Sequence, residues 1–431
     1  MASIPPPDEA MSDNGDEQQA EVRSAFFDVT LPAKHAYLGQ DLREIHSTPF
    51  YAEGSLVTLP FVYVPDVVLM PNQQIPINVD AHDVDINVLI NDMGDIENQR
   101  KGFVCMAADV GFDLSHVKDS HPYFLFGTVA SVVKIEKQPT MPADVGIEGG
   151  TRMIVRGCQR CLLKDFVSRG PFHRQHGLFR ILPENGLEPP LEIIMPNEWK
   201  SAVSLAKRGA QIAANLTPYS PALFATFDVV HLVAELRKEI MALQLKPEMD
   251  IDATDFSYWL STTLPLPAHF RLQLLGAVST VHRLRSCLMM LRTFNRLNCA
   301  VCGIGLAVKE DGICMNRGDL TAAYINPGGV TQEIFTMRKV SNISVFGAPT
   351  AEYTWFPGYT WRHLRCRGCH GHVGWKYESE SPELVPKFFY GLRRGDVVPS
   401  IQPEEGMNPS ELQEFFQVQN GAMQPVYYRE K

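Results

Sequence analysis

The sequence lacks an apolar run near the roughly 20 residues that a membrane-spanning helix needs. Its first residues, Met-Ala-Ser-Ile-Pro-Pro-Pro-Asp-Glu, carry neither a basic nor an apolar stretch, so we do not expect a secretion signal. Positive charge is not in excess either. The formal net charge is −10 over 431 residues, which argues against a nucleic-acid-binding role, because that role usually needs a basic patch.

The nine cysteines are an odd number, and their spacing favours metal binding over disulfides. Two C-x-x-C pairs lie far apart in the sequence, Cys299 with Cys302 and Cys366 with Cys369. Four thiolates complete a tetrahedral zinc shell with no open position, which is typical of a structural site. We expect one structural zinc ion and a reducing compartment, the cytoplasm and nucleus. A third pair, Cys158 and Cys161, is interpreted as ordinary strand cysteines.

The N-terminal half is rich in short β-type runs. Residues 1–25 have the composition of a disordered acidic tail, and residues 26–54 read as an extended arm. From about residue 57 to 182, β-branched and aromatic runs alternate with turn residues, which predicts an antiparallel, partly closed sheet.

The apolar period becomes helical between about residues 196 and 245. A helical core and an exposed partner-binding stripe fit this pattern equally well. Asp255 is expected to cap a short helix, and one long helix is predicted from Ala268 to about Leu291. Arg283 and Arg285 are expected on the polar side of that helix.

The last structured unit, residues 293–402, shows short strands and no convincing helix, and residues 403–431 form a polar tail. It contains Trp355, Trp361 and Trp375, the first two separated by a Pro-Gly turn signal. Three indoles can form a rigid apolar cage for a compact ligand or an ammonium group. They can equally form a small core beneath the zinc, and the residues alone leave both alternatives open.

Two resemblances are visible. Pro65-Asp-Val-Val-Leu-Met-Pro71, Gly127-Thr-Val-Ala130 and Asp255-Phe-Ser-Tyr-Trp with Leu264-Pro-Leu resemble the N-terminal domain of Lon proteases. Ala323-Tyr-Ile-Asn-Pro327, Glu352-Tyr-Thr-Trp-Phe-Pro-Gly-Tyr-Thr-Trp361 and His372-Val-Gly-Trp-Lys376 resemble the thalidomide-binding zinc domain of the cereblon family. The arm is similar to the arm of that family at Phe27-Asp-Val-Thr-Leu-Pro and His35-Ala-Tyr-Leu-Gly39.

The resemblance implies an α+β, multidomain fold. A Lon N-terminal-like β-rich domain (residues 55–292) with a helical insertion (196–250) and a long helix precedes an all-β, zinc-pinned domain of two antiparallel sheets (293–402). It also implies a non-catalytic substrate receptor of a cullin-RING ubiquitin ligase, which presents protein substrates for ubiquitination. The insertion would dock on a damaged-DNA-binding-type β-propeller adaptor.

The ligand implied by the resemblance is a cyclic imide, either the glutarimide of thalidomide-type drugs or a cyclic imide at the C-terminus of a damaged protein. Backbone groups near Tyr353 and Trp355 would meet its polar edge, Asn326-Pro327 would close over it, and Tyr377 would lie at the rim. The implied ligand-site residues are Tyr353, Trp355, Trp361, Trp375, Asn326, Pro327, Glu352 and Tyr377.

The chain departs from the family motif at Tyr353 and Gly328, where histidine is expected, and at His363, where a small aliphatic residue is expected. Two enzymes are excluded. A Lon-type protease would need the P-loop motif G-x-x-x-x-G-K-S/T, which does not appear, and a zinc-type methionine sulfoxide reductase would need a cysteine after Cys369. A reader of methylated lysine, with Glu352 supplying charge, remains the alternative.

Overall fold

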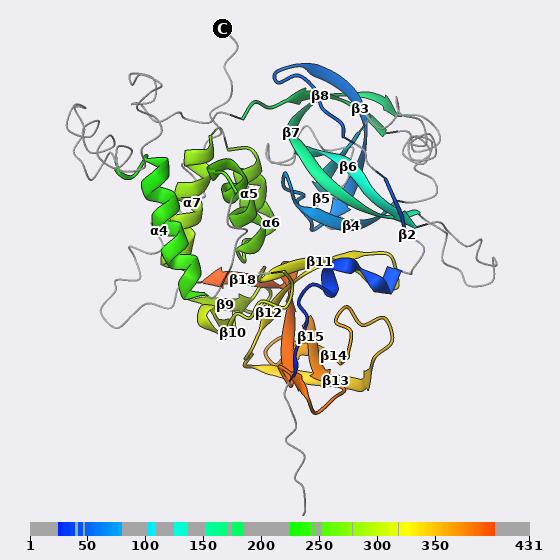
Figure 1. Ribbon diagram of the computed structural model, residues 1–431, viewed down its shortest axis with the longest axis vertical. Helices are drawn as coiled ribbons and strands as arrows, with labels where there is room; N and C mark the ends of the chain where they lie inside the picture. Colours follow the sequence, from blue (N-terminus) through cyan, green and yellow to red (C-terminus); the bar gives the residue numbers. More distant parts are fainter. Residues whose placement is uncertain are drawn as a thin grey trace, which may run out of the picture.

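The computed structural model describes residues 25–38, 42–45, 48–79, 102–108, 125–136, 151–169, 175–184, 225–243, 245, 251–277, 279–317 and 319–400. The expected acidic and polar tails and residues 196–224 of the expected insertion lie outside this set. An N-terminal β unit, a group of helices and a C-terminal β domain lie against one another (Figure 1). None of the described helices is long and apolar enough to cross a membrane.

The N-terminal β unit is a sheet in the order β2-β6-β5-β3-β8-β7-β4, and an additional β6–β7 pairing closes five of its strands into a ring. The predicted partial closure is therefore confirmed, but the prediction of a purely antiparallel sheet is wrong, because β3 and β5 run parallel. The strands are β2 (Leu42–Glu44), β3 (Leu56–Pro65), β4 (Gln74–Val79), β5 (Phe103–Ala108), β6 (Phe126–Glu136), β7 (Thr151–Arg169) and β8 (Gln175–Ile181). Cys161 is buried inside this unit and Cys158 is half-buried, and both lie on β7, as expected for strand cysteines.

The predicted single helix from Ala268 is wrong, because the chain forms two helices there. The first helix ends at Gly276, and the hydroxyl of Ser279 accepts a hydrogen bond from the backbone N–H of His282 to start the second. Asp252, rather than Asp255, caps the preceding helix. The described helices are α4 (Val229–Ala242), α5 (Ala253–Thr263), α6 (Ala268–Leu275) and α7 (Thr280–Thr293).

Helix α4 has both a core face and an exposed face. Leu232, Leu236 and Ile240 are buried and belong to the core that the helices share. Val230 and Met241 are 56% and 73% exposed. The apolar period of this segment therefore reflects core packing, and the exposed apolar residues are a separate set.

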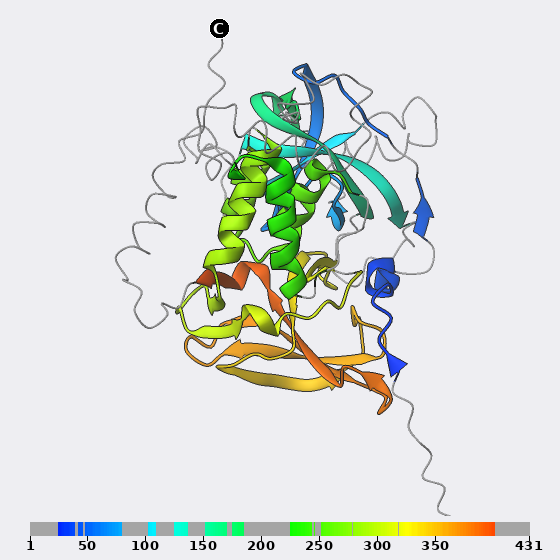
Figure 2. The ribbon, with the colours of Figure 1, turned by 60° about the vertical axis from the view of Figure 1, so that its left-hand side comes forward.

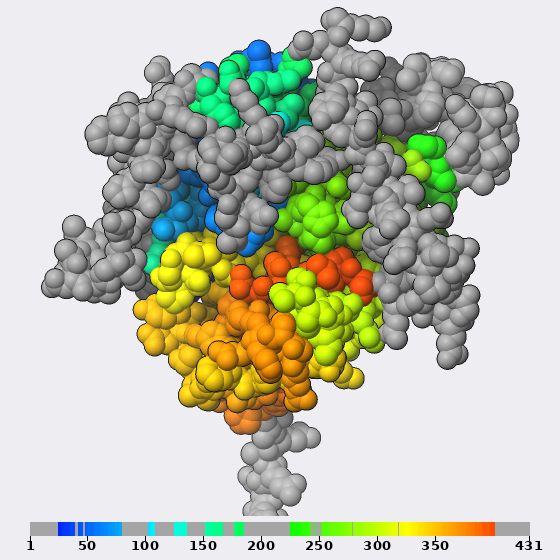
Figure 3. Space-filling model, turned by 180° about the vertical axis from the view of Figure 1, so that it is seen from behind, coloured from blue at the N-terminus to red at the C-terminus, as the bar shows by residue number. Residues whose placement is uncertain are grey.

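The C-terminal domain holds two antiparallel sheets, as predicted. A three-stranded sheet has the order β10-β9-β18, and a six-stranded sheet has the order β11-β12-β17-β15-β14-β13. Viewed from behind, this domain forms the lower part of the molecule (Figure 3). Its strands are β9 (Arg296–Cys299), β10 (Gly305–Val308), β11 (Thr321–Ile325), β12 (Thr331–Met337), β13 (Ile343–Thr350), β14 (Tyr359–Cys366), β15 (His372–Ser379), β16 (Leu384–Val385), β17 (Phe388–Arg393) and β18 (Val397–Ser400).

The arm crosses this domain and continues to the N-terminal unit (Figure 2). Its strand β1 (Ala25–Phe26) pairs with β16, and Phe27 packs edge-on against Tyr359 with ring centroids 5.4 Å apart. The arm is less extended than expected, because it forms two 3-10 turns, Pro32–Lys34 and Ala36–Leu38. Its residues thereby contribute to the core of a domain that begins more than 250 positions later.

Candidate functional site: a cysteine cluster and an aromatic site

The four cysteines of the two C-x-x-C pairs come together at one end of the C-terminal domain. All four Sγ atoms lie within 4.8 Å of one another, with Cys299 and Cys369 at 3.6 Å and Cys302 and Cys366 at 3.5 Å. A zinc ion bound at about 2.3 Å by four thiolates holds the sulfurs roughly 3.8 Å apart. The cluster therefore fits the ion without rearrangement.

Two tight turns aim the sulfurs inward. After β9 the turn passes through Gly303, whose φ of 73° favours glycine, and after β14 it passes through Gly368. A Cβ atom at Gly368 would lie 2.8 Å from the Cys302 sulfur. Burial opposes thiolate formation at Cys366, but hydrogen bonds from the backbone of Cys369 and Gly368 lower its pKa to about 7. Cys366 is thus the ligand most readily deprotonated, which is the form that zinc requires.

Trp355 and Trp375 form the buried half of the aromatic site. They are 6% and 9% exposed, and their rings meet edge-to-face with centroids 4.9 Å apart. Tyr324 stacks on Trp355 at 5.0 Å with an interplanar angle of 10°. One indole face of Trp355 is therefore covered by protein, and its Nε1 donates to the carbonyl of Ile325 at 3.2 Å.

Trp361 is half-buried and packs against the same cluster. Its Nε1 donates to the backbone carbonyl of Glu352 at 2.8 Å, which ties β14 to the loop 351–358. The two indole N–H groups of Trp355 and Trp361 are thus used inside the protein. What these rings offer to a ligand is flat apolar surface.

Two histidines lie between the tryptophans. His363 meets Trp361 edge-on at 5.2 Å, His372 meets Trp375 at 4.9 Å, and Nδ1 of His363 is 3.3 Å from Nε2 of His372. Burial, followed by the charge of Arg393, lowers the pKa of His372 to about 4. Burial and the charge of Arg365 lower the pKa of His363. Both rings are therefore neutral at pH 7 and share one N–H···N hydrogen bond.

The loop beside the rings presents unused backbone groups. Tyr353 has a φ of 52° and a side chain that is 56% exposed. Among the described residues, none donates to the Tyr353 carbonyl and none accepts from the backbone N–H of Trp355. An acceptor and a donor therefore stand two residues apart next to the aromatic surface.

The other predicted residues are distributed differently. Asn326 accepts from the backbone N–H of Val330 at 2.9 Å and holds the β11–β12 turn, in which Pro327 is exposed. Glu352 is exposed beside the rings. Tyr377 is not at a rim, because it is 2% exposed and stacks on Phe389 at 4.8 Å within the core. Alternation along β15 places Tyr377 on the same inward face as Trp375.

Sequence reasoning missed the contributions of Tyr324, Ile325 and His372. The first two lie on β11, 30 or more positions before Trp355, and no local pattern predicts that contact. Strand alternation would have placed His372 on the opposite face from Trp375, which follows it by three residues, and a register shift at Gly374 brings the two rings together. The aromatic site is thus built from β11, β14, β15 and the loop 351–358.

Two family models match this chain. The model described as ATP-dependent protease La (LON) substrate-binding domain matches residues 58–293, which is more than half of the chain. The model described as Yippee zinc-binding/DNA-binding /Mis18, centromere assembly, matches residues 295–409. This second match contains all four clustered cysteines, and together with their geometry it identifies the cluster as a structural zinc site.

Similar proteins have been found along nearly the whole chain. Protein cereblon of Danio rerio is 29% identical over 408 residues, which cover 90% of this chain and 91% of that protein. Protein cereblon of Gallus gallus is 27% identical over 403 residues, which cover 88% and 86%. The solved N-terminal domain of Mycobacterium avium complex Lon protease is 16% identical, with 55% of this chain and 98% of that chain covered and a TM-score of 0.31. The chain therefore belongs to the LON substrate-binding domain family, and in joining that domain to a Yippee-type zinc domain it is similar to cereblon.

Proposed function

We propose that this protein is a non-catalytic substrate receptor of a cullin-RING ubiquitin ligase, and that its aromatic site binds cyclic imides. The imide would be a glutarimide or a cyclic imide at the C-terminus of a damaged protein. The similarity to cereblon over about nine-tenths of the chain supports the receptor role. We further propose that it acts in the cytoplasm and nucleus, next to a damaged-DNA-binding-type β-propeller adaptor.

One observation carries the ligand class: the unused carbonyl of Tyr353 and the unused N–H of Trp355 lie beside flat aromatic surface. A cyclic imide presents an N–H donor between two carbonyl acceptors in one nearly flat edge. The edge would meet the two backbone groups, while the ring stacks on the remaining indole faces. Each neutral hydrogen bond contributes only about 0.5–1.5 kcal/mol, so the rings of Trp361 and Trp375 supply much of the affinity.

The departure at position 353 is compatible with this role. The Tyr353 side chain is 56% exposed, and the recognition argued here uses its backbone. The departure at His363 has a different consequence, because its ring lies between Trp361 and His372. We expect His363 to change the shape of the surface that a bound imide presents to protein substrates.

A reader of methylated lysine is the second candidate, because the exposed Glu352 carboxylate stands next to the aromatic rings. Calorimetry on the full chain with glutarimide and with trimethyl-lysine separates the two functions. If the site binds cyclic imides, the calorimetric titration should show saturable binding of glutarimide and none of trimethyl-lysine. Saturable binding of trimethyl-lysine alone would contradict it.

Adaptor docking is assigned to α4 and the residues that precede it. Phe227, Val230 and Met241 are 49%, 56% and 73% exposed, which is unusual for apolar side chains on one helix and its approach. Replacing Val230 and Met241 with Glu should abolish co-purification with a β-propeller adaptor and leave imide binding unchanged. Unchanged co-purification would exclude this face as the docking surface.

A further inference from the structure

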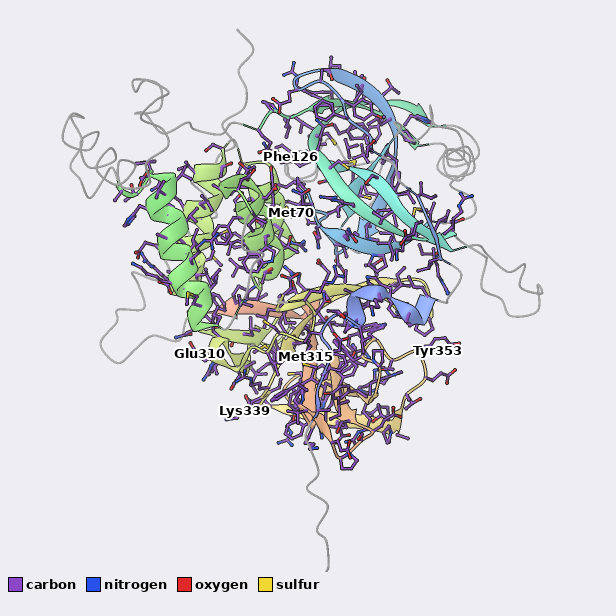
Figure 4. All side chains as sticks on the ribbon, in the orientation of Figure 1. Met70, Phe126, Glu310, Met315, Lys339 and Tyr353 are labelled. Carbon is purple, nitrogen blue, oxygen red and sulfur yellow. The ribbon has the colours of Figure 1, made fainter. Side chains whose placement is uncertain are left out.

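A groove lies in the C-terminal domain between β10, the loop 338–342 and β17, with a volume of about 530 Å³. It is separate from the aromatic site: Lys339, which lines it, and Tyr353 lie on opposite sides of the domain (Figure 4). The volume falls within the range of about 300–1,000 Å³ of small-ligand sites. The charged and aromatic residues that line it are Arg296, Arg338, Lys339, Asp311, Phe388 and Tyr390.

The wall formed by the loop 338–342 is held rigidly against β10. Ser341 donates its backbone N–H to the Leu306 carbonyl at 2.7 Å, and Asn342 donates its side-chain amide to the Gly305 carbonyl at 2.8 Å. Asn342 adopts a left-handed backbone with a φ of 54°. The groove is thus formed before any ligand binds, which lowers the conformational cost of binding.

The Arg296 side chain lies across the strand that forms the groove floor. A Cβ atom at Gly305 would lie 2.9 Å from Cδ and 3.0 Å from Nη1 of Arg296. Glycine at 305 therefore allows the guanidinium to lie flat against the backbone. Among the described residues, no carboxylate forms an ion pair with Arg296 or with Lys339.

The groove is positive on an acidic protein. Three cationic residues line it and Asp311 is its one lining carboxylate, while the whole chain carries a net charge of −10. The adjoining turn adds Lys309 and the exposed Glu310, which offset each other in charge. Such a local reversal of sign attracts an anionic partner.

One end of the groove is apolar. Phe388 is 48% exposed, meets Tyr390 at 6.0 Å and has the Lys376 ammonium 5.3 Å from its centroid. Strand β10 is the outer strand of its sheet, but its Leu306 and Gly305 carbonyls already accept from Ser341 and Asn342. An apolar end beside cationic side chains fits a segment that carries both an apolar side chain and carboxylates.

We propose that this groove binds an acidic segment of a partner protein. Its carboxylates pair with Arg296 and Lys339, and an apolar side chain of the segment packs on Phe388. The proposal is independent of imide binding, because the groove shares no residue with the aromatic site. It gives the domain a second recognition surface, directed at acidic sequence rather than at a cyclic terminus.

The test is fluorescence polarisation on the full chain with a labelled Glu-Glu-Phe-Glu-Glu peptide and its Gln-Gln-Phe-Gln-Gln counterpart. We expect the Glu peptide to bind and to weaken steeply with added salt, because the pairing is charge-driven. Arg296→Gln and Lys339→Glu should each weaken binding about tenfold, as expected for loss of a hydrogen bond to a charged group. Lys164→Glu, an exposed position on β7, makes the same charge change outside the groove and should leave binding unchanged.

Four results would overturn the proposal. Equal binding of the Gln peptide would show that charge is not read, and equal weakening by Lys164→Glu would show that only net charge matters. Binding of the Glu peptide only after Glu404 and Glu405 are changed to Gln would assign the groove to this chain's own acidic sequence. A single-stranded oligonucleotide that binds tighter than the Glu peptide would assign it to nucleic acid. Circular dichroism and zinc content of each variant establish that it is folded.

Discussion

Tyr37 of the arm and Trp355 of the aromatic site bind the same residue. The hydroxyl of Tyr37 accepts from the backbone N–H of Ile325 at 3.0 Å, and Nε1 of Trp355 donates to the Ile325 carbonyl at 3.2 Å. The arm therefore reaches the ligand site through one buried residue of β11. This relay predicts that a change in the arm alters the position of Trp355.

Tyr37→Phe tests the relay. It leaves the N–H of Ile325, which is 2% exposed, without its acceptor and should cost about 1–3 kcal/mol of stability. Tryptophan fluorescence should change in the folded state, because the Trp355 environment depends on Ile325. Tyr390→Phe is the control, since no described residue pairs with that hydroxyl. Identical melting temperatures and spectra for both variants would refute the relay.

The burial of His35 leads us to predict that the protein loses stability in acid. It is 7% exposed with Nδ1 3.0 Å from the Tyr37 hydroxyl, and burial, with a smaller effect of Lys134, lowers its pKa to about 4. Between pH 6.5 and 4 the unfolded chain binds a proton that the folded chain does not. The free energy of unfolding should therefore decrease as the pH is lowered from 6.5 to 4, and His35 accounts for up to about 3 kcal/mol of this decrease.

Urea denaturation at pH 7, 6, 5 and 4.5 measures this slope. His35→Gln should flatten it, whereas His231→Gln, on the exposed face of α4, should not. A His35→Gln variant with the wild-type slope would show that another group is responsible.

Removal of zinc should unfold the C-terminal domain. The four sulfurs join the ends of β9 and β14, which are 67 positions apart from Cys299 to Cys366. Cys366→Ser or a strong chelator should abolish the near-ultraviolet signal of the clustered aromatic residues, because metal binding is coupled to folding. Cys158→Ser, outside the cluster, should leave zinc content and signal intact. A folded, metal-free Cys366→Ser protein would disprove the structural role.

Glu333 holds two buried arginines at the boundary between the domains. Its Oε2 lies 2.5 Å from Nη1 of Arg271 on α6 and 3.4 Å from Nε of Arg394. Glu333→Gln leaves both cations without a counter-charge, and we expect a loss of about 3–5 kcal/mol. Glu380→Gln, at an exposed position, is the matched control. Chemical denaturation of the two variants compares them, and equal midpoints would contradict the assignment.

The zinc cluster and the grouping of the tryptophans could be predicted from the sequence, because C-x-x-C spacing and a Pro-Gly turn act locally. The covering of Trp355 by Tyr324 could not, since it depends on a strand order that no local pattern encodes. Arg283 shows the same limit. It was predicted on a polar helix face, but it is 0% exposed and pairs with Glu184 at 3.0 Å, a residue from a distant segment. Tertiary pairing overrides periodicity there.

The helix break at Gly276 was missed for a different reason. Apolar residues continue in helical register on both sides of it, so periodicity predicts one helix. The sequence does contain signals for the end of one helix and the start of the next, Gly276 followed by Ser279. They are less conspicuous than the continuous helical spacing of the apolar residues. Where the apolar pattern is continuous, helix boundaries are therefore set by the capping residues and not by the spacing of the apolar residues.

Titration of the full chain with glutarimide and N-methylglutarimide tests the central claim most directly. The two molecules share the same ring, but the methylated one lacks the N–H that the Tyr353 carbonyl would accept. We predict saturable calorimetric binding of glutarimide, and binding of N-methylglutarimide that is weaker by at least about tenfold. Equal binding of the two imides, or no binding of glutarimide to zinc-loaded protein, would contradict the account.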